Sequence, residues 1–161
     1  MTFATAKLCD TYSDKAHLQI AEPIFKLFGA ALAFSGQITT LKVFEDNALV
    51  RTALSAKVNQ RVLVIDGGGS HRCALIDEEL AKLALENGWQ GIVVYGCIRD
   101  SAIINAMTIG IRALHAHPLK SPNKGLGNLD TVVTFAGVQF KNDYFLYADS
   151  DGIIVSETEL S

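Results

Sequence analysis

The chain has 161 residues, and its 49% hydrophobic content supplies enough apolar residues for a single-domain core over residues 1–161. Charged residues make up only 19%, which argues against disorder and is consistent with burial of some surface against another subunit. The 14 Lys and Arg against 17 Asp and Glu give a formal net charge of −3, a balance that argues against direct nucleic-acid binding.

The first sixty residues predict short elements. We expect a short helix at residues 5–12 and another at residues 47–56, where the apolar residues share one side. Between them, residues 36–45 alternate polar and apolar side chains and predict a strand.

A β-α-β unit follows. The β-branched run at residues 61–66 predicts a buried strand, which three consecutive glycines end in a tight loop. Residues 77–87 are the clearest helix, with Asp77 as N-cap, acidic residues in the first turn and a glycine stop at position 88. Residues 91–96 are a second buried strand. Because such strands run parallel, the start of the helix lies at the edge where both strands end.

The last third of the chain is rich in β-structure. Residues 104–115 are expected to be helical, and a stretch with two prolines and a glycine, residues 117–125, is expected to be a loop. Strands are predicted at residues 131–135, 137–140, 144–148 and 153–156. Together the elements predict a single α/β domain with a mixed sheet.

The sequence also indicates a compartment. No apolar run approaches the roughly 20 residues of a membrane helix, and the first ten residues lack the pattern of a signal peptide. Cys9, Cys73 and Cys97 are odd in number, widely spaced and form no C-x-x-C pair. This pattern favours reduced thiols in a cytoplasmic protein over a disulfide framework or a zinc site.

Several reactive groups converge at the end of the predicted β-α-β unit. Arg99 and Asp100 follow the second strand directly, and the helix start at residues 77–80 reaches the same edge. Open α/β sheets bind ligands in the crevice outside the carboxyl ends of their strands. Free helix N–H groups and a guanidinium both favour an anion, and Arg99 can bind a carboxylate through two hydrogen bonds.

The same edge of the predicted sheet also carries carboxylates that can bind a metal ion. Asp100 can hold a divalent cation, since Mg²⁺ is commonly bound by one carboxylate and waters while the substrate completes its shell. Glu78, in the first helical turn, can orient a metal-bound water or move a proton. These groups suit a small α-keto acid that chelates the metal, with the metal stabilising an enolate as a carbon–carbon bond breaks.

Each feature alone has a simpler explanation. Arg99 and Asp100 can be a surface loop pair, and Asp77 and Glu78 are ordinary helix-start residues. The glycine loop after Asp66 matches neither G-x-G-x-x-G nor a P-loop, so nucleotide binding is poorly supported. Only the convergence of these residues predicts a site.

Three other patterns are assigned structural roles. His115 and His117 are expected to be a helix-end pair, because residues i and i+2 do not share a helix face. The stretch from Asp149 to Gly152 starts like a calcium loop but lacks the later ligands, so we expect a hairpin turn. Cys97 is expected to pack in the interior.

Five separated segments carry a family resemblance. They are EPIF (22–25), FSGQI (34–38), VIDGGG (64–69), YGCIRD (95–100) and YADSDG (147–152). They resemble the RraA family, the regulators of ribonuclease E activity, which is related to class II 4-hydroxy-4-methyl-2-oxoglutarate aldolases. The similarity covers nearly the whole chain. It implies a swivelling-domain-like α/β core and a ring-shaped homotrimer with active sites at subunit interfaces.

The resemblance also implies roles for single residues. Arg99 would be catalytic and bind the substrate carboxylate and keto group, and Asp100 would hold the metal, Mg²⁺ or Mn²⁺. Glu78 occupies the position of a second catalytic carboxylate. The substrate would be lined by Asp77, Glu78, Glu79 and Leu80 together with Arg99.

Two positions depart from the aldolase pattern. Glu78 stands where aldolases usually have Asp, which lengthens that side chain by one methylene. Ile103 stands where they often place a further acidic residue after Arg-Asp.

The resemblance implies two functions of different classes. As an enzyme, the chain would cleave 4-hydroxy-4-methyl-2-oxoglutarate to two pyruvates and would decarboxylate oxaloacetate through the same enolate. As a binding protein, it would inhibit ribonuclease E by direct contact, without chemistry of its own. Asp100 favours the enzyme, because a pure regulator has no need of a metal carboxylate there.

Overall fold

Four parallel strands form the centre of the sheet. The computed structural model describes residues 2–15 and 17–161. The strands are β3 (Phe34–Lys42), β4 (Arg61–Asp66), β6 (Trp89–Ile98) and β7 (Gly110–Ala116), in that spatial order. Val64 lies opposite Thr40 on one side and Val93 on the other, and all three are fully buried. Burial on both faces explains why β4 and β6 contain continuous runs rich in Val and Ile.

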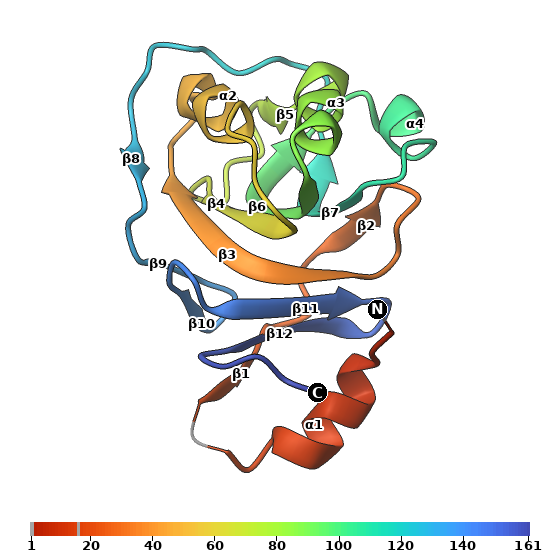
Figure 1. Cartoon of the computed structure of the whole chain (residues 1–161). Helices are drawn as coiled ribbons and strands as arrows, with labels where there is room; N and C mark the ends of the chain where they lie inside the picture. Colours follow the sequence, from red (N-terminus) through yellow and green to blue (C-terminus); the bar gives the residue numbers. More distant parts are fainter. Residues whose placement is uncertain (1, 16) are drawn as a thin grey trace.

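Each crossover between neighbouring parallel strands carries a helix on the same side of the sheet (Figure 1). The helices are α2 (Ala48–Leu54), α3 (Glu78–Glu86) and α4 (Ser101–Ile104). α3 buries Leu80, Ala81 and Ala84, which follow helical spacing. The predicted β-α-β unit of β4, α3 and β6 is therefore present, and its loop contains a further short strand, β5 (Ala74–Ile76), paired with β6.

Antiparallel strands extend this sheet at both edges and make it mixed, as predicted. Beyond β3 lie β11 (Phe145–Asp149), β12 (Gly152–Ser156) and β1 (Leu18–Ile20), and at the other edge β2 (Lys26–Phe28) pairs with β7. β8 (Asn128–Leu129) also pairs with β3, whereas β9 (Val133–Phe135) and β10 (Val138–Phe140) form a separate hairpin. α1 (Thr5–Tyr12) packs against β11 and β12 on the side away from the other helices (Figure 1).

The helix predicted over residues 104–115 is wrong. The helical segment ends at Ile104, and the chain then turns into β7, the fourth parallel strand. Residues from Gly110 to Ala113 are buried on both faces of the sheet. The strand therefore lacks the alternation of polar and apolar side chains that distinguishes a strand from a helix in a sequence.

Arg112 is buried in this strand because other strands supply acceptors for it. Its guanidinium donates to the carbonyls of Leu32 at 2.6 Å and Asp149 at 3.3 Å, and it lies 5.1 Å from the centre of the Phe34 ring. Burial lowers the pKa of Arg112 to about 10, so the side chain remains protonated at neutral pH. It thereby joins β7 to the segment before β3 and to the end of β11.

Two glycines make room for the aromatic ring that covers these strands. Gly91 of β6 and Gly110 of β7 lie side by side in the sheet. A Cβ atom would lie 2.4 Å from the Phe34 ring if placed on Gly91, and 2.1 Å if placed on Gly110. Both distances are far below van der Waals contact, so the packing of Phe34 requires glycine at both positions.

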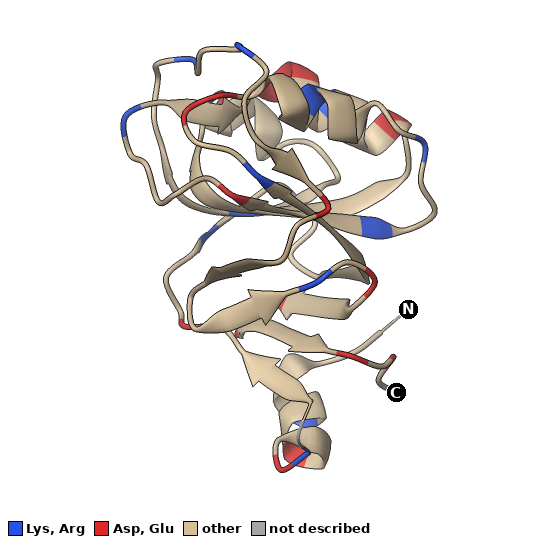
Figure 2. Ribbon diagram, turned by 90° about the vertical axis from the view of Figure 1, so that its left-hand side faces the viewer, with Lys and Arg blue, Asp and Glu red and all other residues tan. Residues whose placement is uncertain are grey.

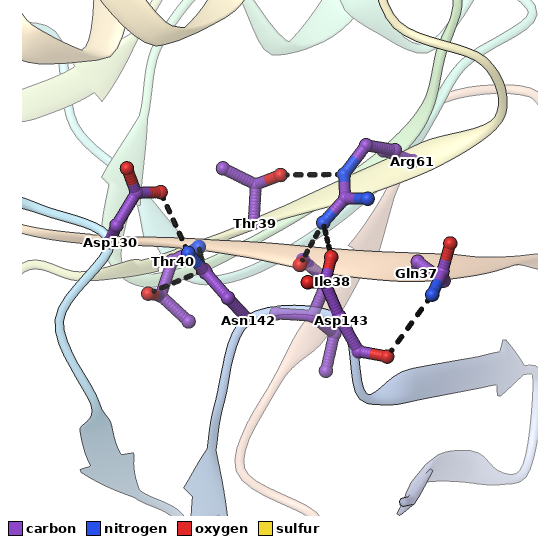
Figure 3. Close-up of polar contacts among 8 residues, drawn as sticks. All are labelled: Gln37, Ile38, Thr39, Thr40, Arg61, Asp130, Asn142 and Asp143. Atoms are coloured by element: carbon purple, nitrogen blue, oxygen red, sulfur yellow. Dashed lines mark hydrogen bonds and ion pairs between the residues drawn. The ribbon is translucent and has the colours of Figure 1, made fainter. Parts of the chain in front are cut away.

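A polar network joins the antiparallel part of the sheet to the parallel part (Figure 3). Arg61 of β4 donates to Asp143 Oδ1 at 2.7 Å, in the turn that precedes β11. In the same turn, Asn142 Oδ1 accepts the backbone N–H of Thr40 at 2.8 Å, and its amide group donates to Asp130 at 2.8 Å. These side chains fix β11 in register beside β3.

Charged residues are interspersed over the described chain. Figure 2 shows Lys and Arg positions scattered among Asp and Glu positions on helices, loops and strands. No helix within residues 2–15 and 17–161 is long and apolar enough to cross a membrane.

Asp46 holds the loop that leads from β7 towards β8. Its carboxylate is 2% exposed and accepts backbone N–H groups from Ala48, Lys124, Gly125 and Leu126 at 3.0–3.2 Å. Burial by itself raises the pKa of Asp46, but the four donors outweigh it and lower the pKa below its ordinary value. The charged form of Asp46 therefore stabilises the folded protein at neutral pH.

We predict that Asp46→Asn lowers the free energy of unfolding by about 2 to 3 kcal/mol at neutral pH, because an amide nitrogen would face backbone donors. Urea denaturation measures this difference. The stabilisation is present above the unfolded-state pKa of about 4 and is lost as the pH falls through the lower folded-state pKa. The difference from wild type should therefore shrink in acid. The exposed Asp14→Asn should shift stability by less than about 0.5 kcal/mol; equal effects of the two substitutions would contradict the prediction.

Candidate functional site

The carboxyl end of β6 and the start of α3 are tied together by one side chain. Asp100 follows β6 and adopts a left-handed backbone conformation, with φ of +59°, that Asp tolerates better than most residues. Its side chain does not cap α4. Instead, Asp100 Oδ2 accepts the backbone N–H of Glu78 at 3.0 Å. The two predicted halves of the site are thus in direct contact.

Asp77 links the helix start to the arginine. Its Oδ1 accepts the N–H of Leu80 at 2.9 Å, which confirms Asp77 as the N-cap of α3. Its Oδ2 lies 3.9 Å from a terminal nitrogen of Arg99, and these side chains are 20% and 31% exposed. The separation exceeds a hydrogen bond, so Arg99 is oriented by charge while its donors remain available to a ligand.

The helix start offers fewer free amides than the sequence predicts. The N–H groups of Glu78 and Leu80 are already bonded to the carboxylates of Asp100 and Asp77. The side chain of Leu80 is 1% exposed and belongs to the core, and Leu80 is not among the residues that line the cavity at this site. Anion binding here must therefore depend on cationic side chains more than on the helix end.

A cavity of about 660 Å³ lies over these residues. Asp77, Glu78, Glu79, Arg99 and Asp100 line it. The start of α2 and the loop after β7 contribute further polar lining residues, Asn47, Arg51, Lys120, Ser121 and Asn123. The sequence analysis missed these residues, because their segments lie far apart in the chain and no local motif marks them.

The charges in the cavity favour a bound cation. Four carboxylates and three cationic side chains line it, which leaves one net negative charge. Glu79 lies 3.4 Å from Arg51, and Glu78 lies 3.6 Å from Lys82, one turn further along α3. Asp100 has no cationic partner in the part of the chain that the structure describes, so it is the carboxylate best placed to receive a metal ion.

The donor set fits a hydrated metal ion rather than a closed protein cage. Across residues 2–15 and 17–161, no three His, Cys, Asp or Glu side chains are grouped to hold a metal. One oxygen of Asp100 is used by Glu78, and Oδ1 accepts no bond from any described residue. A single free carboxylate oxygen, with waters and a substrate to complete the shell, is how Mg²⁺ is commonly held.

The other sequence patterns have structural roles. Asp149 and Gly152 pair across the β11–β12 turn, as the predicted hairpin requires. Cys97 is 1% exposed, and burial raises the pKa of its thiol, which fits packing in the interior. The helix-end assignment of His115 and His117 is wrong, because His115 lies in β7 and His117 directly follows it.

Comparison with known proteins identifies close relatives. The sequence profile of the RraA-like family, described as Aldolase/RraA, matches residues 5–155. A protein of Methylococcus capsulatus named "Putative 4-hydroxy-4-methyl-2-oxoglutarate aldolase" is 58% identical over 160 residues, covering 99% of each chain.

Two solved structures share the whole fold. The RNA-processing inhibitor RraA from Thermus is 40% identical with a TM-score of 0.94, over 100% of this chain and 96% of that one. A Geobacillus kaustophilus protein described as an S-adenosylmethionine:2-dimethylmenaquinone methyltransferase is 46% identical with a TM-score of 0.95, over 98% and 97% of the two chains.

The cap of α3 gives a prediction that separates the two interactions of Asp77. Asp77→Ala removes the acceptor for the Leu80 N–H and should cost about 1 kcal/mol of unfolding free energy in urea denaturation. Asp77→Asn keeps an oxygen acceptor and should cost only a few tenths of a kcal/mol. If Asn is as destabilising as Ala, the charge towards Arg99, and not the cap, stabilises the helix start.

Proposed function

The chain belongs to the RraA-like family, described as Aldolase/RraA, and on that premise we propose that it is a carbon–carbon lyase that cleaves 4-hydroxy-4-methyl-2-oxoglutarate to two pyruvates. The observation that carries the proposal is the meeting of Arg99, Asp100 and the start of α3 in one cavity. Relatives named "Putative 4-hydroxy-4-methyl-2-oxoglutarate aldolase", among them one 58% identical and one 54% identical, support it.

Arg99 binds the reacting end of the substrate in this proposal. Its guanidinium lies beyond hydrogen-bond distance of Asp77, so its donors can pair with the carboxylate and keto oxygen of an α-keto acid. The same positive charge stabilises negative charge that develops on the keto oxygen in the transition state.

Asp100 would hold a divalent ion, Mg²⁺ or Mn²⁺, through its free oxygen Oδ1. The ion supplies a Lewis acid that polarises the keto group. The bond of Oδ2 to the Glu78 N–H keeps the carboxylate in a fixed orientation towards the cavity.

Cleavage breaks the bond between C3 and C4 of the substrate. The C4 hydroxyl loses its proton and becomes the carbonyl of the first pyruvate, while the electron pair stays on C3 as the enolate of the second. We assign to Glu78, which lines the cavity beside Arg99 and Asp100, the removal of the hydroxyl proton and its delivery to C3 of the enolate, which completes the second pyruvate. The same enolate forms when oxaloacetate loses carbon dioxide, so oxaloacetate decarboxylation is a second expected activity.

The proposal also covers the oligomeric state of the protein and its cellular compartment. We propose a ring-shaped cytoplasmic homotrimer with active sites at subunit interfaces. Exposed apolar side chains, among them Phe44, Leu126 and Val132 at 50–65% exposure, support burial against other copies. Analytical ultracentrifugation should give three times the mass of one chain.

An assay coupled to lactate dehydrogenase tests the chemistry. Wild type with Mg²⁺ should release pyruvate from 4-hydroxy-4-methyl-2-oxoglutarate and from oxaloacetate. Asp100→Ala and Asp100→Asn should each lower kcat/KM by at least about 100-fold, because both remove the charge that would hold the metal. Asp100→Asn retains an acceptor for the Glu78 N–H, so it separates loss of charge from loss of structure.

Asp14→Asn serves as the control for that assay, since Asp14 is exposed and lies outside the cavity. It should retain wild-type activity. Absence of pyruvate release by the wild type would reject the aldolase proposal.

Inhibition of ribonuclease E is the second candidate function, and the 40% identity to the Thermus RNA-processing inhibitor favours it. Such inhibition would act through contact with the nuclease, without direct RNA binding. We expect co-purification with ribonuclease E and slower cleavage of an RNA substrate, and Asp100→Ala should retain both effects. A chain that neither co-purifies with the nuclease nor slows it would rule out this function.

A further inference from the structure

A second cavity, of about 270 Å³, lies where α1 meets β1 and the turn between β11 and β12. Figure 1 shows α1 at the far end of the molecule from α2, α3 and α4, and no residue that lines this cavity also lines the one over Asp100. Two of the five segments that carry the family resemblance, residues 22–25 and 147–152, contribute to the lining and have no part in the proposed reaction. The volume admits a ligand of the size of an amino acid.

A buried cation lines this cavity. Arg112 is 2% exposed, and its Nη1 and Nη2 donate only to backbone carbonyls, those of Ile111, Leu32 and Asp149. Its Nε donates to no described residue, and within residues 2–15 and 17–161 no buried side-chain nitrogen or oxygen lacks a partner. The Nε–H is therefore still accessible, and the cavity is the space that it can reach. Because no described carboxylate forms an ion pair with this guanidinium, its charge is available to an anionic group of a ligand.

The carboxylates of the cavity offer the opposite charge. They come from Glu22, Asp149 and Asp151, and they exceed the single cation of the lining by two charges. Asp149 is used within the protein, since its side chain accepts the N–H and the hydroxyl of Thr5 at 2.8 and 2.6 Å. Glu22 and Asp151 are exposed, and their side chains make no hydrogen bond or ion pair with any described residue. These two carboxylates are therefore available to a cationic group.

We propose that this cavity binds an α-amino acid with an apolar side chain. Arg112 would hold the α-carboxylate, and Glu22 and Asp151 would hold the α-ammonium group. The net negative charge opposes a simple anion, and a simple cation brings no partner for the buried guanidinium, whereas a zwitterion offers one group to each sign of charge. The side chain of the ligand would contact the hydrophobic part of the lining, which is made of Ile20, Phe25, Leu27 and Ile154.

Calorimetry with L-leucine and two analogues tests the charged contacts. 4-Methylpentanoate lacks the ammonium group of leucine, and L-leucinamide carries a neutral amide in place of the carboxylate. Wild type should bind L-leucine at least about 10-fold more tightly than either analogue, because each analogue loses charge-assisted hydrogen bonds. Changing the ligand leaves Arg112 intact, which matters because Arg112 also joins β7 to neighbouring segments and its substitution can unfold the protein.

The apolar contact is tested with glycine, which carries both charged groups and has no side chain. It should bind at least about 10-fold more weakly than L-leucine, because it buries no apolar surface in the cavity. Glycine that binds as tightly as L-leucine would overturn the apolar specificity.

A double variant tests the contact to the ammonium group. Glu22→Gln combined with Asp151→Asn removes both free carboxylates and keeps the size of the side chains. It should weaken L-leucine binding at least about 10-fold and should not weaken binding of 4-methylpentanoate, which has no ammonium group. Asp14→Asn is the control, because it removes an exposed carboxylate outside the cavity. It should leave the affinity for L-leucine unchanged.

The measurement needs no turnover, so its outcome is independent of the proposed lyase activity. Absence of L-leucine binding by wild type, equal binding of L-leucine and both analogues, or equal effects of the double variant and Asp14→Asn would each overturn the amino-acid site. Asp100→Ala should leave L-leucine binding unchanged, since Asp100 lines the other cavity. Loss of binding in that variant would place the ligand in the other cavity and overturn the inference.

Discussion

The candidate site depends on the hydrogen bond from the Glu78 N–H to Asp100 Oδ2, which is 3.0 Å long. This bond connects the residues just after β6 to the start of α3. Along the chain, the two bonded residues are separated by the full length of α3 and β6. Asp100 has a left-handed backbone conformation, and its carboxylate bonds to the start of α3 and does not cap α4. Arg99, the preceding residue, is thereby placed beside the Asp77 cap.

The same bond changes where an anion can bind. A helix start usually offers several free N–H groups, but in α3 two carboxylates take the N–H groups of Glu78 and Leu80. The positive end of the helix is thus used to position Asp100 and Asp77. Recognition of an anionic substrate is left to cationic side chains of the cavity, such as the guanidinium of Arg99.

Local patterns predicted the β-α-β unit and the convergence of Arg99 and Asp100 with the start of α3, because parallel strands force these segments to one edge. They did not predict β7, whose first four residues are buried and include a charged residue, Arg112, stabilised by carbonyls of distant segments. The lining residue Lys120 was missed for a similar reason. Its position depends on pairing with β5, a contact across more than forty residues that leaves no periodic signal.

The net charge of the cavity affects binding of both the metal ion and the keto-acid substrate in the proposed reaction. Its lining side chains carry one net negative charge, which by itself opposes the entry of a dianionic keto acid. A divalent cation at Asp100 would change that net charge from −1 to +1 and make the same cavity attractive to the dianion. Binding of the metal would therefore strengthen binding of the substrate, and binding of the substrate would strengthen binding of the metal by the same factor.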